Sequence, residues 1–207
     1  MVNFQKDDWQ GVSTTSLADA LQGVGTMNSH IKPLNKYMRM VGPAFTVQII
    51  KNDCAVVFKA LHDAAPGEVL VIDTDGSADV AFLGEIVVHI AQKRGLAGIV
   101  IDGCIRDSLD ISEGSFPVFA KGAVPKIPAA VYLGKTQQVI QCGGVVVKPG
   151  MIIYGDADGV VVVPEEKQTD VVKNAKSKEA ADRWKLTRMI PDSDMLQKFL
   201  DEQCVHE

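Results

Sequence analysis

Residues 84–107 read GEIVVHIAQKRGLAGIVIDGCIRD, and this stretch decides the fold. Apolar residues recur at helical spacing over 84–94, and Gly95 stands where a helix cap is expected. The aliphatic run 99–101 follows as a short strand. The segment therefore predicts a helix, a buried strand, and then a turn that carries Arg106 and Asp107.

Working outward, the preceding residues supply the partners of this strand. We expect strands over 45–50 and 69–72 and a helix over 54–64, because β-branched runs alternate with a helical pattern that Pro66 and Gly67 interrupt. Strands that are aliphatic throughout are typical of parallel sheets covered by helices on both faces. Ligands of such sheets bind at the carboxyl ends of the strands.

The second half of the chain is β-rich, and its pattern predicts an antiparallel or mixed arrangement. The expected strands are 129–133, 139–141, 145–147, 152–153 and 160–163. We expect residues 1–207 to form one α/β domain, of which 165–207 are a charged helical tail. Trp184, Leu186 and Met189, followed by Met195, Phe199 and Leu200, are its candidate packing stripes, either on its own domain or on a neighbouring subunit.

Composition excludes several classes of function. The formal charge of −5 leaves no basic face for a nucleic acid. The four cysteines are far apart, with no C-x-x-C pair, so they predict neither a zinc site nor a disulfide framework. The N-terminus resembles no signal peptide, and no apolar run approaches the length of a membrane span. We expect a cytoplasmic protein with no nucleic-acid or membrane partner.

The helix start at 84–87 and the turn at 102–107 are expected to meet at one edge of the sheet. The free amides of Ile86 and Val87 are a natural seat for a carboxylate. Arg106 can hold the same anion with its planar fork of donors, and Asp107 can ligate a hard divalent cation.

This set of groups suits a 2-oxo acid that passes through an enolate, because negative charge develops on its keto oxygen. Glu85 could orient a water molecule or transfer a proton. The alternative interpretation is structural: Arg106 and Asp107 form a surface ion pair of little energetic value, and Glu85 is a first-turn acid that suits the helix dipole. In either case Gly103 is expected to give the turn its conformational freedom.

The spacing of Glu85, Arg106, Asp107 and Asp110 closely resembles the central signature of a known family. This family comprises the regulators of ribonuclease E activity (RraA-like proteins) and the class II 4-hydroxy-4-methyl-2-oxoglutarate aldolases. The resemblance continues through FPVFAKGAVP at 116–125 and GDADGVVVVP at 155–164, and more faintly through SLADAL at 16–21. It covers most of residues 13–180.

The resemblance implies a swivelling β/β/α fold, a homotrimer or a multiple of it, and active sites at subunit clefts. It also implies that Asp107 ligates Mg²⁺ or Mn²⁺, that Arg106 binds the pyruvoyl group, and that Gly84, Ile86 and Val87 hold the substrate carboxylate. The implied reaction is retro-aldol cleavage of a 4-hydroxy-2-oxo dicarboxylate to pyruvate, with oxaloacetate decarboxylation through the same enolate.

Three features depart from the family pattern. The signature acid is often Asp, whereas this chain has Glu85. Members often carry Gly-Asp-Asn where this chain reads Asn52-Asp53-Cys54. Aldolases of the family draw a carboxylate from the C-terminal region of a neighbouring subunit, and here either Glu179 or Asp182 could supply it.

Two other functions are compatible with parts of the sequence. VIDTDGS at 71–77 resembles the nucleophile motif of haloacid-dehalogenase-type phosphatases, with Asp73 as nucleophile, Asp75 as acid or base and GDADG at 155–159 as later metal ligands. Alternatively, the chain is a non-catalytic regulator that binds a protein partner. Cys104 has no histidine at a legible partner position, so it is interpreted as a small buried residue rather than a nucleophile.

Overall fold

A parallel sheet forms the centre of the molecule. The computed structural model describes residues 4–50, 53–128 and 133–204. Its parallel strands, in spatial order, are β6 (Val118–Ala120), β4 (Gly98–Ile101), β3 (Val69–Asp73) and β2 (Met40–Gln48). Antiparallel neighbours extend both edges: β1 (Lys32–Pro33) joins β6, while β11 (Ile152–Asp156) joins β2 and is followed by β12 (Gly159–Val163).

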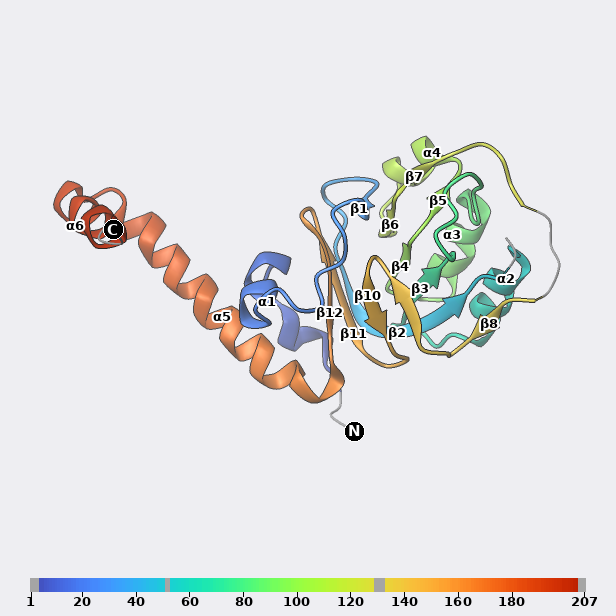
Figure 1. Ribbon diagram of the computed structural model, residues 1–207, viewed down its shortest axis with the longest axis horizontal. Helices are drawn as coiled ribbons and strands as arrows, with labels where there is room; N and C mark the ends of the chain where they lie inside the picture. The colour runs from blue at the N-terminus through green and yellow to red at the C-terminus, as the bar shows by residue number, and fades with distance from the viewer. Residues whose placement is uncertain (1–3, 51–52, 129–132, 205–207) are drawn as a thin grey trace.

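Both faces of this sheet are buried, as the aliphatic strands predict. Successive side chains of a strand point to opposite faces, so Leu70 and Ile72 belong to one core cluster and Val69 and Val71 to another. Helices α2 (Ala55–Asp63) and α3 (Glu85–Lys93) cover the first face. The hairpin of β9 (Ile140–Cys142) and β10 (Val145–Val147) covers the second (Figure 1).

Most predicted elements of the first half are confirmed within one residue at each end. Helix α3 ends at the predicted cap, where Gly95 has φ +75°. The prediction for β2 was wrong at its start: the strand begins at Met40, five residues before Phe45. Residues 40–43 pair with β11, and a partner more than a hundred residues away leaves no local signal.

In the second half, the antiparallel pairs β9–β10 and β11–β12 confirm the predicted arrangement. The expected strand over 129–133 lies outside the described residues except for Leu133. Several short elements were not predicted: η1 (Lys6–Trp9), α1 (Thr14–Ala20), β5 (Cys104–Ile105), α4 (Ser108–Glu113), β7 (Gly122–Ala123) and β8 (Lys135–Thr136).

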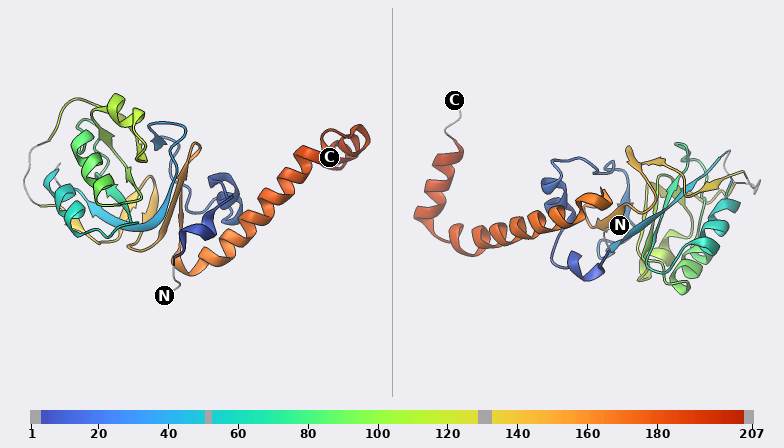
Figure 2. Two further views of the ribbon diagram at one scale, coloured as in Figure 1. Left: turned by 180° about the vertical axis from the view of Figure 1, so that it is seen from behind. Right: turned by 90° about the horizontal axis from the view of Figure 1, so that it is seen from below.

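The C-terminal tail is helical, as predicted, and consists of η2 (Glu165–Lys167), α5 (Gln168–Trp184), η3 (Lys185–Met189) and α6 (Ser193–Gln203). The first half of α5 packs on α1 through Val171, Val172 and Ala175. The rest projects away from the sheet (Figures 1 and 2). Met189 is buried, but Trp184 is 50% and Leu200 45% exposed. Most residues of these stripes therefore do not pack on their own domain, and packing on a neighbouring subunit stays a prediction.

The described helices include none that is both long and apolar enough to cross a membrane.

Candidate active site

Arg106 and Asp107 lie between β5 and α4, a few residues after the central strand β4. Asp107 is the residue before the first turn of α4 and adopts a left-handed backbone conformation, with φ 56° and ψ 39°. Aspartate tolerates this region better than most residues, although it remains uncommon. This conformation turns the chain sharply where the two side chains are presented.

The start of α3 meets this turn directly. The Glu85 amide donates a hydrogen bond to Asp107 Oδ2 at 3.1 Å, and Arg106 Nε lies 3.2 Å from the same oxygen. A Cβ atom on Gly84 would lie 2.8 Å from Arg106 Cγ and would collide with Asp107 Oδ2. Gly84 is therefore required by the close approach of the two segments.

The backbone amides of Ile86 and Val87 lie in the first turn of α3, where a helix provides no hydrogen-bond acceptor. Within residues 4–50, 53–128 and 133–204, neither amide donates a hydrogen bond. Both residues line a hollow of about 260 Å³ that also contains Gly84, Arg106 and Asp107. We call this hollow the apolar pocket, because its other large wall residues are Phe58, Phe82, Leu83 and Ile127.

A second hollow lies against the same two residues. It measures about 580 Å³, and besides Arg106 and Asp107 it is lined by Ser108, Leu109, Asp110 and residues 123–125. We call it the acidic pocket, since Asp107 and Asp110 outweigh Arg106 in charge. Arg106 and Asp107 thus border two hollows of different character.

Glu85 occupies a different place from the other candidate residues. Its side chain is 47% exposed and lies 3.3 Å from His89 Nε2, one helical turn along α3. It is absent from the linings of both pockets. The backbone of Glu85 therefore belongs to the site, whereas its carboxylate faces solvent beside His89.

Asp53 and Gly103 have structural explanations. Asp53 is fully buried and accepts hydrogen bonds from the amides of Ala55, Leu133 and Gly134, so it joins the start of α2 to a distant loop. Asn52 lies outside the described residues. The expectation that Gly103 supplies conformational freedom was wrong: its φ is not left-handed, and a Cβ there would lie 2.7 Å from Thr74 Cγ2.

The donor set near Asp107 limits which metal could bind. Among the described residues no group of three or more His, Cys, Asp or Glu side chains could hold a metal ion. A zinc site with three protein ligands does not fit this arrangement. Mg²⁺ commonly takes one or two carboxylates and completes its shell with water and substrate oxygens, and Asp107 fits that mode.

The pairing of β2 with its two neighbouring strands is incompatible with the phosphatase interpretation, because it places the proposed nucleophile and the proposed metal ligands at opposite ends of β2. Asp73 is paired with Gln48 at one end of this strand, while Gly155, next to Asp156, is paired with Met40 at the other. Eight residues of strand separate these positions by about 26 Å. Asp156 is buried and accepts hydrogen bonds from the Thr14 amide and hydroxyl, which anchors α1.

Cys104 is 6% exposed, and burial raises the pKa of its thiol, which favours the interpretation as a small buried residue over that as a nucleophile.

Both candidate carboxylates of the tail have partners within their own chain. Ser13 Oγ, at the cap of α1, donates a hydrogen bond to Glu179. Asp182 lies 3.3 Å from Lys178 Nζ and 3.4 Å from Lys185 Nζ. These contacts do not distinguish the two residues as donors to a neighbouring site.

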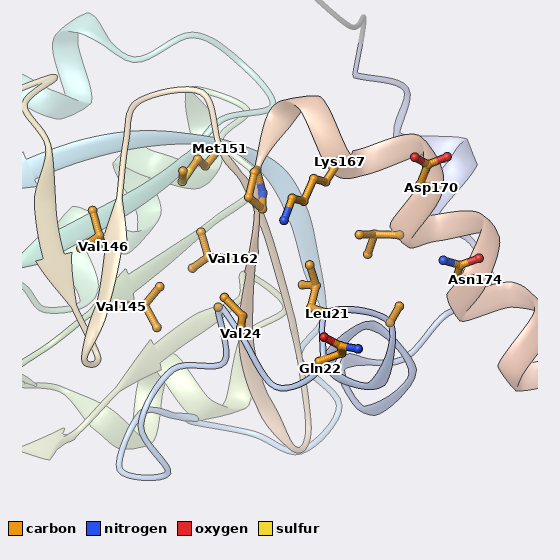
Figure 3. A pocket seen from close by; sticks show the side chains of 14 residues that line it. Leu21, Gln22, Val24, Val145, Val146, Met151, Val162, Lys167, Asp170 and Asn174 are labelled. Carbon is orange, nitrogen blue, oxygen red and sulfur yellow. The ribbon is translucent and has the colours of Figure 1, made fainter.

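Another hollow of about 580 Å³ lies in a different part of the fold, between the end of α1, the β9–β10 hairpin and α5. Figure 3 shows Leu21, Val24, Val145 and Val162 around it, with Lys167 and Asp170 on the α5 side. Its floor is aliphatic, and the titratable side chains among its described lining residues are Lys167 and Asp170. The groups that can perform chemistry gather instead around Arg106 and Asp107.

Sequence reasoning missed the walls of the apolar pocket. Phe58 and Ile127 come from α2 and from the loop after β7, and neither segment carries a motif that points to the site.

Some known proteins that are similar to this chain are named as enzymes, and others are described as regulators. A protein of Halalkalibacterium halodurans named "Putative 4-hydroxy-4-methyl-2-oxoglutarate aldolase" is 40% identical over 195 residues, which are 94% of this chain and 92% of that protein. The structure of the RNA-processing inhibitor RraA from Thermus thermophilis is 29% identical, with a TM-score of 0.68 over 75% of this chain and 94% of that one.

The Streptomyces coelicolor protein RraAS2, described as an unusual member of the RNase ES inhibitor RraA family, is 28% identical, with a TM-score of 0.78 over 90% of this chain and 98% of that one. These structures share the swivelling β/β/α architecture. The family model "RraA-like: Aldolase/RraA" matches residues 14–162. The chain therefore belongs to the RraA-like family.

Proposed function

We propose that this chain is a divalent-metal-dependent lyase that cleaves a 4-hydroxy-2-oxo acid to pyruvate and a second carbonyl compound. The observation that carries the proposal is the convergence of unpaired amides, a guanidinium and a carboxylate around one pocket. The aldolase name of the Halalkalibacterium halodurans relative supports it and makes 4-hydroxy-4-methyl-2-oxoglutarate the first substrate to test. Oxaloacetate, which decarboxylates through the same enolate, is the second.

Each group has a role in this proposal. The Ile86 and Val87 amides donate to the substrate carboxylate at the positive end of α3. Arg106 stabilises negative charge on the 2-oxo oxygen. Asp107 holds Mg²⁺ or Mn²⁺, and a divalent cation when bound supplies Lewis-acid polarisation of the 2-oxo group. Gly84 leaves the space that this arrangement needs.

The proposed retro-aldol cleavage needs neither an oxidant nor a reductant. The C3–C4 bond breaks, and its electron pair becomes the enolate of pyruvate. The C4 hydroxyl loses a proton as C4 becomes a carbonyl, and C3 later gains one. Glu85 is the proposed proton carrier. Because its side chain is solvent-exposed and lies outside both pocket linings, it would transfer the proton through a water molecule.

The test is pyruvate release from both substrates, with Mg²⁺ and with a chelator, after subtraction of the metal-only rate. Asp107→Ala and Asp107→Asn should reduce enzymatic turnover by at least about 10²-fold. Asn preserves the left-handed backbone and can accept from the Glu85 amide, so it separates charge from folding. Asp75→Asn is the matched control, because Asp75 has φ 54° in an exposed turn. Wild-type rates in both Asp107 variants would remove the assignment.

The similarity to RraA structures favours a second candidate, a regulator that binds a protein partner. Such a protein would need neither a divalent cation nor Asp107 for its function. We also propose that residues 1–207 act as one domain that assembles as a homotrimer, in which Glu179 or Asp182 completes a neighbouring site. Analytical ultracentrifugation measures that assembly.

A further inference from the structure

The carboxylate of Asp107 has hydrogen-bond donors at both of its oxygens. Arg106 Nε lies 3.3 Å from Oδ1 and 3.2 Å from Oδ2, and the Glu85 amide donates to Oδ2 at 3.1 Å. A carboxylate offers about four acceptor positions, two on each oxygen, so these contacts fill Oδ2 and leave a position on Oδ1. The oxygen that can still accept a cation is therefore one that the guanidinium of Arg106 also contacts.

The two oxygens of Asp107 differ in what holds them. A Cβ atom on Gly84 would collide with Oδ2, and the amide that donates to Oδ2 belongs to the first residue of α3. Oδ2 is thus enclosed by the backbone of the helix start. Among the described residues, the contact of Oδ1 is with the side chain of Arg106, which can change its rotamer.

The contact between Arg106 and Asp107 is weak enough to be replaced. The side chain of Arg106 is 43% exposed and that of Asp107 is 32% exposed. Exposed ion pairs contribute little free energy, because water screens the two charges. A divalent cation has twice the charge of a guanidinium and approaches a carboxylate oxygen to about 2.0–2.1 Å in the case of Mg²⁺. A cation on Oδ1 would therefore repel the guanidinium and compete with it for the same carboxylate.

We propose that Arg106 occupies Asp107 until a divalent cation binds, and that it then turns to the 2-oxo acid. This inference rests on the proposed function and adds an order of binding, with the cation before the substrate. Arg106 lines both the apolar and the acidic pocket, so an anion in either one is within its surroundings. Arg106 should lower the cation affinity of the substrate-free site. A bound substrate anion should raise that affinity, and linkage requires the cation to raise substrate affinity by the same factor.

The test measures binding of Mn²⁺ to the full-length protein without substrate, from the electron paramagnetic resonance signal of free Mn²⁺. Arg106→Gln should bind Mn²⁺ at least about threefold more tightly than the wild type, because the positive charge beside Asp107 is removed. Arg106→Met removes the same charge and should behave alike. Arg39→Gln is the matched control, since Arg39 is exposed and directly precedes β2, at the amino edge of the parallel strands. Unchanged or weaker Mn²⁺ binding in both Arg106 variants would overturn the inference.

Pyruvate then serves as the probe for coupling between anion and cation. Saturating pyruvate should tighten Mn²⁺ binding in the wild type, and this effect should be largely lost in Arg106→Gln. A wild-type Mn²⁺ affinity that pyruvate leaves unchanged would also overturn the inference.

Asp107→Asn distinguishes this inference from the proposed function. Mn²⁺ binding that requires Asp107 but is not tightened by the Arg106 variants rejects the inference alone. Absence of any Mn²⁺ binding that requires Asp107 rejects the proposed function as well.

Discussion

Gly84→Ala tests whether the close approach of α3 to the Arg106–Asp107 turn is needed for activity. The added Cβ would lie 2.8 Å from Arg106 Cγ, against an ordinary contact of at least 3.4 Å, so the arginine stem must move by at least 0.6 Å. The Asp107 carboxylate must move as well, which weakens its 3.1 Å hydrogen bond from the Glu85 amide. Both groups that we propose to act on the substrate are thereby displaced together.

The expected loss follows from these displacements. A misplacement of about 1 Å can cost about 10²-fold in rate, so a shift of roughly 0.6 Å predicts a 10- to 100-fold loss in kcat/KM. This corresponds to about 1.4 to 2.7 kcal/mol of transition-state stabilisation. Overpacking typically costs about 1 to 3 kcal/mol of stability. For a chain of this length the melting temperature should then fall by about 2 to 4 °C per kcal/mol, and the protein should remain folded.

The assay is pyruvate release with Mg²⁺, together with thermal unfolding followed by circular dichroism. Gly122→Ala serves as the control, because a Cβ there meets only Cys104 Sγ at 3.8 Å. A folded Gly84→Ala protein with wild-type kcat/KM would refute the argument that this contact positions the site.

Two further predictions concern charges at the carboxyl edge of the sheet. Burial raises the pKa of the Asp73 carboxyl, and the nearby Asp102 adds to the shift, so the folded state binds a proton more readily than the unfolded state. The unfolding free energy should therefore fall as pH rises through and above the ordinary carboxyl range, and Asp73→Asn should reduce that slope in denaturant titrations across pH. Lys121 pairs with Asp102, whose side chain is 14% exposed and accepts from the Gly143 amide at 2.7 Å. Lys121→Ala leaves this carboxylate without its cation and should cost about 3 kcal/mol in urea unfolding, whereas the exposed Lys126→Ala should cost less than about 0.5 kcal/mol.

The sequence predicted the parts of the fold that depend on local patterns. Helix α3 and its Gly95 cap follow from helical spacing and a left-handed glycine, and strands β3 and β4 follow from continuous aliphatic runs. The early start of β2 could not be predicted, because it depends on pairing with β11 far along the chain. Short elements such as α4 and β5 contain too few residues to show a period.

The candidate site also has parts that the sequence predicted and parts that it did not. Arg106, Asp107 and the start of α3 could be placed together, because the ends of neighbouring parallel strands share one edge of the sheet. Phe58 and Ile127 could not be assigned to the pocket, since each comes from a segment whose sequence suits an ordinary packing or surface role. The side chain of Glu85 faces solvent beside His89, a detail that depends on its rotamer rather than on its position in the sequence.

If Arg106 and Asp107 stabilise the enolate of a 2-oxo acid, as we propose, exchange of the pyruvate methyl protons in D₂O measures that step alone. Proton NMR of pyruvate with wild-type protein and Mg²⁺ should show exchange well above the metal-only rate. Chelation or Asp107→Asn should abolish the excess. Exchange at the metal-only rate in the wild type, or an equal excess in Asp107→Asn, would contradict the account.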